Sequence, residues 1–132
     1  MAKITNAALT ITEELPAGKS VVKVTCRVKF SPLDVNLMRS GLGYRLNCRI
    51  WGEDWGQDSW IDPDNSLFSF ESKRYPDINP TPNEDVTFET KINTSILNED
   101  SGTDEIYGQL TLSNNFNSDK IRKKTNVIIH KF

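Results

Sequence analysis

The residues best suited to chemistry lie in one stretch, 51–65, which reads Trp-Gly-Glu-Asp-Trp-Gly-Gln-Asp-Ser-Trp-Ile-Asp-Pro-Asp-Asn. It holds all 3 tryptophans of the chain together with Glu53 and four aspartates. Gly, Pro, Asp and Asn at this density predict a loop. A loop that carries such large aromatic side chains either folds back onto the core or presents a surface to a partner.

Two interpretations of these aromatic side chains remain open. Either all the rings cover one end of the folded domain, or they form a surface that contacts a partner. Exposed tryptophan often anchors protein interfaces, and tryptophan flanked by acids and amides also suits stacking on a sugar ring. The predicted interaction residues are three aromatic anchors with an acidic rim, namely Trp51, Trp55 and Trp60 with Glu53, Asp54 and Asp58.

The same stretch contains a weak calcium motif, formed by Asp58, Asp62 and Asp64 with the amide of Asn65. Hard cations bind several oxygen ligands supplied by a flexible loop. The spacing is not that of an EF-hand, and a solvated acidic turn explains the same residues. Calcium is therefore a secondary prediction, and no other cofactor is predicted.

The candidate nucleophiles do not form a catalytic pattern. Cys26 and Cys48 both fall at apolar positions of alternating segments, so we expect two buried free thiols. The only histidine, His130, lies close to the chain end, in what we expect to be a frayed tail. The sequence has no glycine-rich phosphate loop, no Cys-x-x-Cys and no nucleophile elbow. We therefore expect a protein that is not an enzyme.

The elements that must position these residues are predicted by alternation of apolar and polar side chains, which is typical of half-buried strands. In 20–30 the inward residues are valines, Cys26 and Phe30, and in 44–51 they are Leu46, Cys48 and Ile50. Five further strands are predicted around Ala7, Leu9 and Ile11; Phe68 and Phe70; Val86, Phe88, Thr90 and Ile92; Ile106, Gly108, Leu110 and Leu112; and residues 120–132.

One short helix is predicted after Ser31, which is followed by Pro32 and by an acid at position 34. Serine at the N-cap, proline in the first turn and an acid three residues later are typical of a helix start. Gly41 is suited to end this helix after about two turns.

About seven short strands joined by Gly-, Pro- and Asn-rich turns predict an all-β fold, an antiparallel β-sandwich. The architecture resembles that of immunoglobulin-like or fibronectin-III-like modules, with a C2-like sandwich or a partly closed barrel as alternatives. We expect a single domain over 1–132. Residues at the inward positions of these alternating strands are expected to form one core. This core contains Val24, Cys26, Val28, Leu46, Ile50, Phe88 and Leu110.

Composition restricts the function further. The net charge of −2 argues against a general nucleic-acid binder, which needs a basic surplus. The sequence lacks the run of about 18 apolar residues that a membrane-spanning helix needs. No export signal is recognisable at the start, so a cytoplasmic location is expected by default.

The basic run 120–124 has two interpretations. It either protects an edge strand from pairing or contacts an acidic patch on a neighbour.

We therefore expect a non-enzymatic structural or protein-interaction module. It would act as a subunit or accessory component of a larger assembly, or as a homo-oligomer, and its partner would be another protein or further copies of itself. The alternative is a carbohydrate- or calcium-binding module that uses the loop 51–65.

Overall fold

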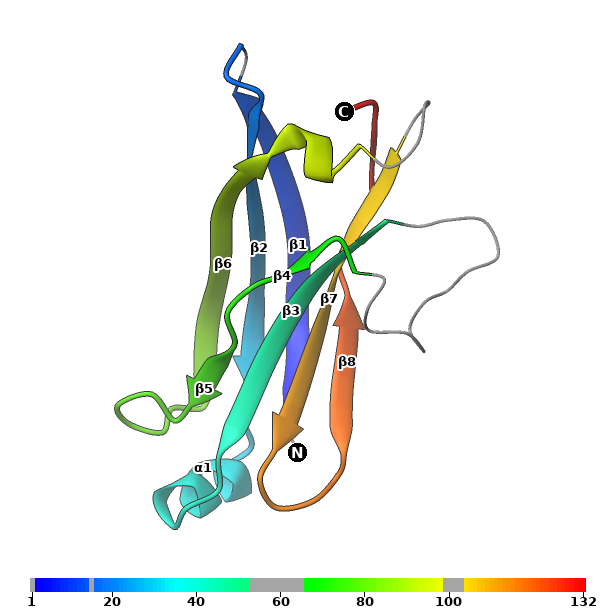
Figure 1. Ribbon diagram of the computed structural model, residues 1–132. Coiled ribbons are helices and arrows are strands. Elements are labelled where there is room, and N and C mark those ends of the chain that lie inside the picture. The colour runs from blue at the N-terminus through cyan, green and yellow to red at the C-terminus, as the bar shows by residue number, and fades with distance from the viewer. Residues whose placement is uncertain (1, 15, 53–65, 99–103) are drawn as a thin grey trace.

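The computed structural model describes residues 2–14, 16–52, 66–98 and 104–132, and two antiparallel sheets make up most of this part of the chain (Figure 1). The first sheet has the order β1-β2-β6, with bounds β1 Lys3–Glu14, β2 Lys19–Lys29 and β6 Asn83–Asn93. The second sheet has the order β4-β3-β7-β8, with β5 beside β3 and β9 beside β7. Its bounds are β3 Tyr44–Gly52, β4 Phe68–Ser69, β5 Lys73–Tyr75, β7 Asp104–Asn114, β8 Lys120–Lys124 and β9 Ile128–His130. The prediction of an all-β, sandwich-like fold is confirmed.

The predicted strand 120–132 is interrupted and β5 was not predicted, which together account for the nine strands of the described residues. β4 and β5 both pair with β3, and β8 and β9 both pair with β7. Between β8 and β9 the chain stays bonded to β7, because Thr125 N donates to Gly108 O at 2.9 Å and Gly108 N donates to Thr125 Oγ1 at 2.8 Å. A Cβ atom at position 108 would lie 3.2 Å from Thr125 Cγ2, so glycine permits this close approach.

The residues predicted to share one core do so. Alternate side chains of a strand point to opposite faces, so each inward set meets the inward set of the opposing sheet. All seven belong to one buried cluster, with exposed fractions of 0% for Val24, Val28, Leu46, Ile50 and Leu110, 3% for Phe88 and 5% for Cys26.

Strand β1 departs from simple alternation. It begins at Lys3, earlier than predicted, and its register shifts between Thr5 and Ala8. Ile4 and Leu9 are both buried although five positions separate them, which would place them on opposite faces of a regular strand. Asn6, with φ of +55°, forms the bulge that returns both side chains to the core.

The predicted helix is α1, Pro32–Arg39, and its start is confirmed. Ser31 Oγ accepts a hydrogen bond from Asp34 N at 3.1 Å, and Asp34 Oδ2 accepts from Ser31 N at 3.0 Å. Gly41 follows the helix with φ of +115°, a conformation that favours glycine. A 3-10 turn, η3 (Thr94–Ile96), follows β6.

On the side of the sandwich between β1 and the chain end, the amide of Asn126 bonds the backbone of β1. Leu9 N donates to Asn126 Oδ1 at 2.7 Å, and Asn126 Nδ2 donates to Leu9 O at 3.1 Å. The side chain thereby bonds both backbone groups of Leu9, as a neighbouring strand would. No helix in the described part of the chain is long and apolar enough to cross a membrane.

Candidate functional site

Of the stretch 51–65, the structure describes Trp51 and Gly52, at the end of β3. The other predicted interaction and calcium residues lie outside the described residues; these are Glu53, Asp54, Trp55, Asp58, Trp60, Asp62 and Asp64. Asn65 lies outside them as well.

Trp51 lies on the outer face of the second sheet, opposite to the inward residues Leu46, Cys48 and Ile50, but its side chain does not face solvent. Only 3% of it is exposed, and its cross-strand neighbour Tyr107 is also 3% exposed. The Nζ atom of Lys124 lies 4.1 Å from the centre of the Tyr107 ring. The burial of Trp51 agrees with the interpretation in which the aromatic side chains cover one end of the domain, and its role as an interaction anchor stays a prediction.

The indole nitrogen of Trp51 is buried, and no residue of the described part accepts a hydrogen bond from it. An indole N–H can only donate, and buried donors in folded proteins nearly always have an acceptor. The indole N–H of Trp51 therefore lacks an acceptor among the described residues.

Beside Trp51, the outer face of the second sheet is hollowed and polar. The hollow has a volume of about 340 Å³ and is lined by Asn47, Arg49, Trp51, Gln109, Thr111, Lys120 and Arg122. These residues come from β3, β7 and β8. The predicted basic run 120–124 therefore lies in the same surface as Trp51, which the sequence did not indicate.

The register of the strands arranges cations on this outer face. Arg45 lies opposite Arg74 on one side and Ser113 on the other, and Ser113 lies opposite Lys120. The next rows are Asn47-Thr111-Arg122 and Arg49-Gln109-Lys124. At these paired positions, every neighbour of a cation across the sheet is another cation, an amide or a hydroxyl.

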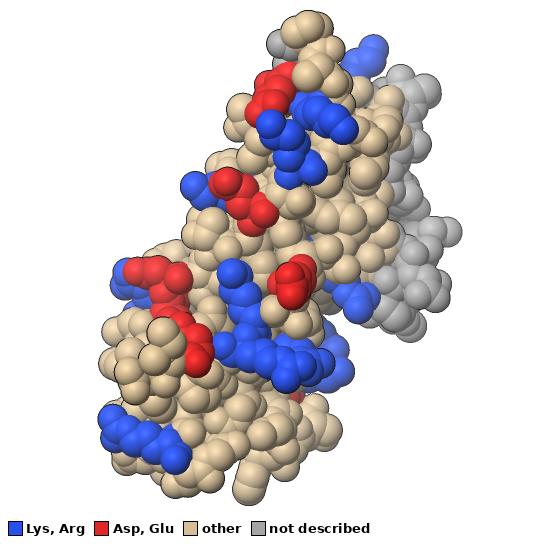
Figure 2. All heavy atoms as spheres, turned by 60° about the vertical axis from the view of Figure 1, so that its left-hand side comes forward, with Lys and Arg blue, Asp and Glu red and all other residues tan. Residues whose placement is uncertain are grey.

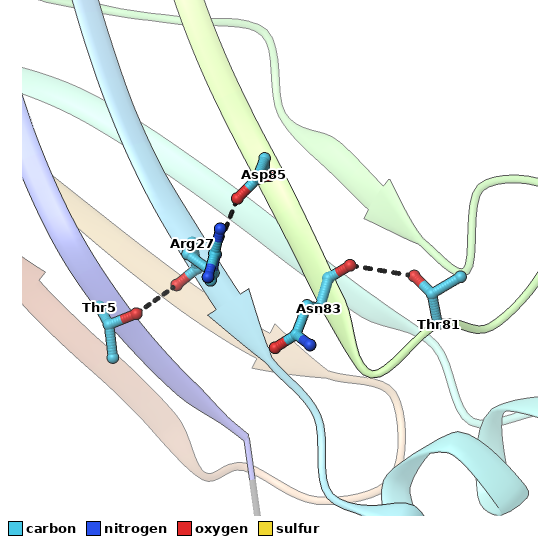
Figure 3. A network of polar contacts seen from close by, with 5 residues as sticks. All are labelled: Thr5, Arg27, Thr81, Asn83 and Asp85. Atoms are coloured by element: carbon cyan, nitrogen blue, oxygen red, sulfur yellow. Dashed lines mark hydrogen bonds and ion pairs between the residues drawn. The ribbon is translucent and has the colours of Figure 1, made fainter.

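The outer face of the first sheet is arranged differently. Lys23 lies opposite Glu89, and Arg27 Nε donates to Asp85 Oδ1 at 2.8 Å (Figure 3). Thr5 Oγ1 adds a hydrogen bond to Arg27 O at 3.4 Å. Figure 2 shows acidic and basic side chains interspersed on the side of the molecule that it presents. Lys23 and Arg27 thus each have a carboxylate opposite them, whereas Lys3 and Lys29 of the same sheet lie opposite one another.

A second surface lies at the end of the molecule that carries α1 and the turn between β7 and β8. Leu33, Leu37 and Phe116 are 65%, 44% and 84% exposed, respectively. They line one hollow of about 880 Å³ together with Leu42, Leu112 and Ile121. Sequence reasoning missed this surface. The available signal was a leucine pair at i and i+4 of the predicted helix, together with a lone phenylalanine in a turn of Asn, Ser and Asp.

The two cysteines extend from β2 and β3 into the shared core, and both are free thiols, as predicted. Burial raises the pKa of the Cys26 thiol to about 11. Burial, and secondarily the nearby Cys26, raise the pKa of Cys48 as well. Both sulfurs are therefore protonated near neutral pH, when a thiol is a poor nucleophile.

The histidine lies in an ordered element, so the expectation of a frayed tail is wrong. His130 belongs to β9 and pairs with Asp104 of β7. Its Nε2 atom lies 2.8 Å from Glu13 Oε1, and its ring packs edge-on against Phe132. These contacts connect the end of the second sheet to β1.

Among the described residues, no three or more His, Cys, Asp or Glu side chains form a group that would hold a metal ion. Comparisons with protein-family models, with curated proteins and with solved structures find no match for this chain.

Proposed function

We propose that this protein is a non-enzymatic interaction module, which acts as a subunit or accessory component of a larger assembly or as a homo-oligomer. The observation that carries the proposal is the apolar end surface, formed by Leu33, Leu37 and Phe116 around one hollow. Contiguous exposed apolar side chains typically mark a contact surface in soluble proteins. A partner that covers this end would remove their apolar area from water.

The strand order supports a fibronectin-III-like type within the sandwich class. For this comparison β4 and β5 count as one strand, and β8 and β9 count as another. Numbered this way along the chain, the first, second and fifth strands, which are β1, β2 and β6, form one sheet. The fourth strand pairs with the third, whereas in constant-type immunoglobulin domains it joins the first, second and fifth. Modules of this architecture commonly serve as recognition units, which is an argument by analogy.

The chemistry of the described side chains supports a role without catalysis. The thiols are protonated and buried in the core. Nucleophilic catalysis needs a nucleophile within hydrogen-bond distance of a base. The imidazole of His130 is instead paired with Glu13 at the opposite edge of β7 from β3.

Native mass measurement over a concentration series tests the apolar end surface. Leu37→Ser with Phe116→Ser is expected to reduce self-association or partner capture without changing the fold, because both side chains are exposed. Ile78→Ser is the matched control, since Ile78 is 89% exposed but does not line this hollow. A wild-type monomer at every concentration would restrict the proposal to a different partner chain. Assembly unaffected by the double variant would contradict it.

A separate proposal from the sequence concerns the loop 51–65. Trp55→Ala is expected to leave the melting temperature nearly unchanged while weakening assembly, and charge reversal at Asp54 and Asp58 is expected mainly to slow association, as rim charges do. Unfolding of Trp55→Ala would instead assign the ring to the core. Tryptophan fluorescence titrated with calcium and with glycans tests the alternative ligand-binding role of this loop.

A further inference from the structure

We propose that the free edge of strand β6 pairs with the same edge of a second copy of this chain, so that the first sheets of two protomers join into one antiparallel sheet. The paired segment is centred on residues 85–91, and a two-fold axis at Phe88 relates the two copies. This inference rests on the homo-oligomer form of the proposed function. It uses a different surface from the apolar end surface, so the two can fail separately.

The position and ladder of β6 show which of its backbone groups face outward. β6 is the last strand in the order β1-β2-β6, and Figure 1 shows it at the border of the first sheet. Just before β6, Phe30 N donates to Pro82 O at 2.8 Å, and just after it, Thr94 N donates to Gly18 O at 2.9 Å. Bonded and non-bonded pairs alternate along an antiparallel ladder. The backbone groups of the even-numbered residues of β6 therefore face β2, and those of the odd-numbered residues face away from it.

The outward backbone groups of residues 85–91 are unpaired. At one end of this edge, Thr81 Oγ1 donates to Asn83 O at 3.3 Å (Figure 3). Beyond that contact, no hydrogen bond from the described part of the chain reaches the outward N–H and C=O groups of residues 85–91. A row of unpaired N–H and C=O groups is a template for pairing with another strand.

The other sheet edges carry features that discourage such pairing. β1 has the bulge at Asn6, and Asn126 bonds its backbone at Leu9. β4 and β5 have only 2 and 3 residues, and β8 has 5, of which 3 are lysines. Short strands, bulges and lysines are the usual means of blocking an edge. β6, by contrast, runs for 11 residues without a shift in register.

The charges on β6 are complementary to their own copy. In a two-fold interface, residue i lies opposite residue j and residue j lies opposite residue i. Paired residues point to the same face of a sheet, so the axis must pass through a residue. An axis at Phe88, the midpoint of β6, places Asp85 of each copy opposite Lys91 of the other. Opposite charges at directly paired positions stabilise a sheet.

Neighbouring registers are less favourable. An axis at Thr87 would place Asp85 opposite Glu89, and an axis at Glu89 would place this carboxylate opposite itself. Like charges in such positions destabilise a sheet. An axis at Thr90 would pair Glu89 with Lys91 but would leave residues 83–86 outside the shared sheet. The register with the longest overlap is therefore also one with opposite charges, which favours a second copy over an unrelated strand.

The charged residues keep capacity for a second partner. Within its own chain Asp85 Oδ1 accepts from Arg27 Nε, and Lys91 Nζ lies 2.9 Å from Glu14 Oε2. The side chains of Asp85 and Lys91 are nonetheless 79% and 54% exposed. An ammonium has three donors, and a carboxylate has two accepting oxygens. The second copy would therefore extend these pairs rather than replace them.

The main test exchanges charge between two variants. Asp85→Lys and Lys91→Glu each place like charges opposite one another, so each alone is expected to dimerise about tenfold more weakly than the wild type. An equal mixture of the two is expected to recover the wild-type affinity, because the new lysine of one variant then lies opposite the new glutamate of the other. Native mass measurement over a concentration series detects both effects. Lys3→Glu, a charge reversal at an exposed position of β1, is the control and should leave dimerisation unchanged.

A second test removes one outward N–H. Thr87→Pro is expected to abolish dimerisation, because proline has no N–H and this position does not donate to β2. Thr87→Ala removes the same exposed side chain but keeps the N–H, and it should dimerise as the wild type does. Circular dichroism melting verifies the fold of each variant. Should Thr87→Pro unfold, the charge exchange decides the matter.

Cross-linking tests the register. With the axis at Phe88, residue 87 of one copy lies opposite residue 89 of the other. The Cα atoms of such a bonded pair are about 5.5 Å apart, which suits a disulfide. Oxidation of a mixture of Thr87→Cys and Glu89→Cys should therefore give linked dimers, whereas either variant alone should not. The native Cys26 and Cys48 are buried and do not compete.

Several results would overturn the proposal. One is a wild-type monomer at every concentration at which the protein stays soluble. Others are a dimer that survives Thr87→Pro with its fold intact, a mixture of the charge variants that assembles no better than each alone, and cross-linking of either cysteine variant by itself. A dimer lost in Leu37→Ser with Phe116→Ser but unaffected by the β6 variants would overturn this inference and leave the proposed function standing.

Discussion

At the scale of single residues, the carboxylate of Asp34 connects α1 to β3. Burial alone would raise the pKa of Asp34, but hydrogen bonds from the Ser31 backbone, the Ser31 hydroxyl and Tyr44 Oη together hold it below its ordinary value. The same contact, after the burial of the phenol, raises the pKa of Tyr44 to about 12. The carboxylate therefore serves both as the helix cap and as the acceptor for a buried phenol.

Asp34→Asn is expected to destabilise the protein at neutral pH by about 1–2 kcal/mol, because the cap and the charged acceptor are both weakened. The lowered pKa of Asp34 means that its contribution is present above the unfolded value of about 4 and is lost as pH falls through the folded value. Urea midpoints at neutral pH and below pH 4 measure both effects. The gap between wild type and variant should shrink in acid, and a constant gap would contradict this role.

The thiols give a second prediction at this scale. Because burial raises the pKa of Cys26 and Cys48, both should react slowly with iodoacetamide in the native protein at mildly alkaline pH. In denaturant without reductant both should alkylate fully, as intact mass would show. Resistance to alkylation until reductant is added would mean that the thiols are bridged.

At the scale of elements, local sequence chemistry predicts α1 well but not the course of β1 or of the chain end. The helix start depends on Ser31, Pro32 and Asp34, which lie next to one another in the chain. The bulge at Asn6 and the bond between Asn126 and Leu9 depend on partners far away in sequence. Periodicity contains no information about such partners.

Asn126→Ala is expected to cost about 1–3 kcal/mol of unfolding free energy, because the N–H and C=O of the buried Leu9 both lose their partner, although Asn126 itself is exposed. Asn36→Ala is the matched control. Asn36 is exposed on α1, where alanine is the better helix former, so its loss should be neutral or stabilising. Chemical denaturation measures both variants, and equal stabilities would refute the role of Asn126 in closing the sandwich.

At the scale of the whole molecule, one core joins the two sheets, and its residues from β2, β3 and β7 are completely buried. Val28→Ala and Ile50→Ala should each cost about 2 kcal/mol or more, since a close-packed core does not fully collapse onto the space left behind. Thr10→Ala, at an exposed position of β1, serves as the control. Losses below about 0.5 kcal/mol at both core sites would contradict the assigned facing.

The two outer faces also differ at this scale, because the strands of the second sheet carry more cations and fewer carboxylates than those of the first. On the first sheet Lys23 and Arg27 lie opposite carboxylates, although Lys3 lies opposite Lys29, and the second sheet groups its cations. Strand order and register then decide which of these cations become neighbours. Lys120 and Arg45 are far apart in sequence, yet both lie opposite Ser113.

The sequence by itself determined the all-β class, the inward residues of β2, β3, β6 and β7, the two free thiols and the capped helix. Each of these follows from neighbours in the chain: alternation selects a face, and the cap is made within four residues. Only the tertiary structure decided that Trp51 is buried on the outer face, that the basic run 120–124 shares a hollow with it, and that Leu37 and Phe116 line a common apolar surface. Those features arise where strands from distant parts of the chain pair in a particular register. That register is selected by the packing of the whole core rather than by any single segment.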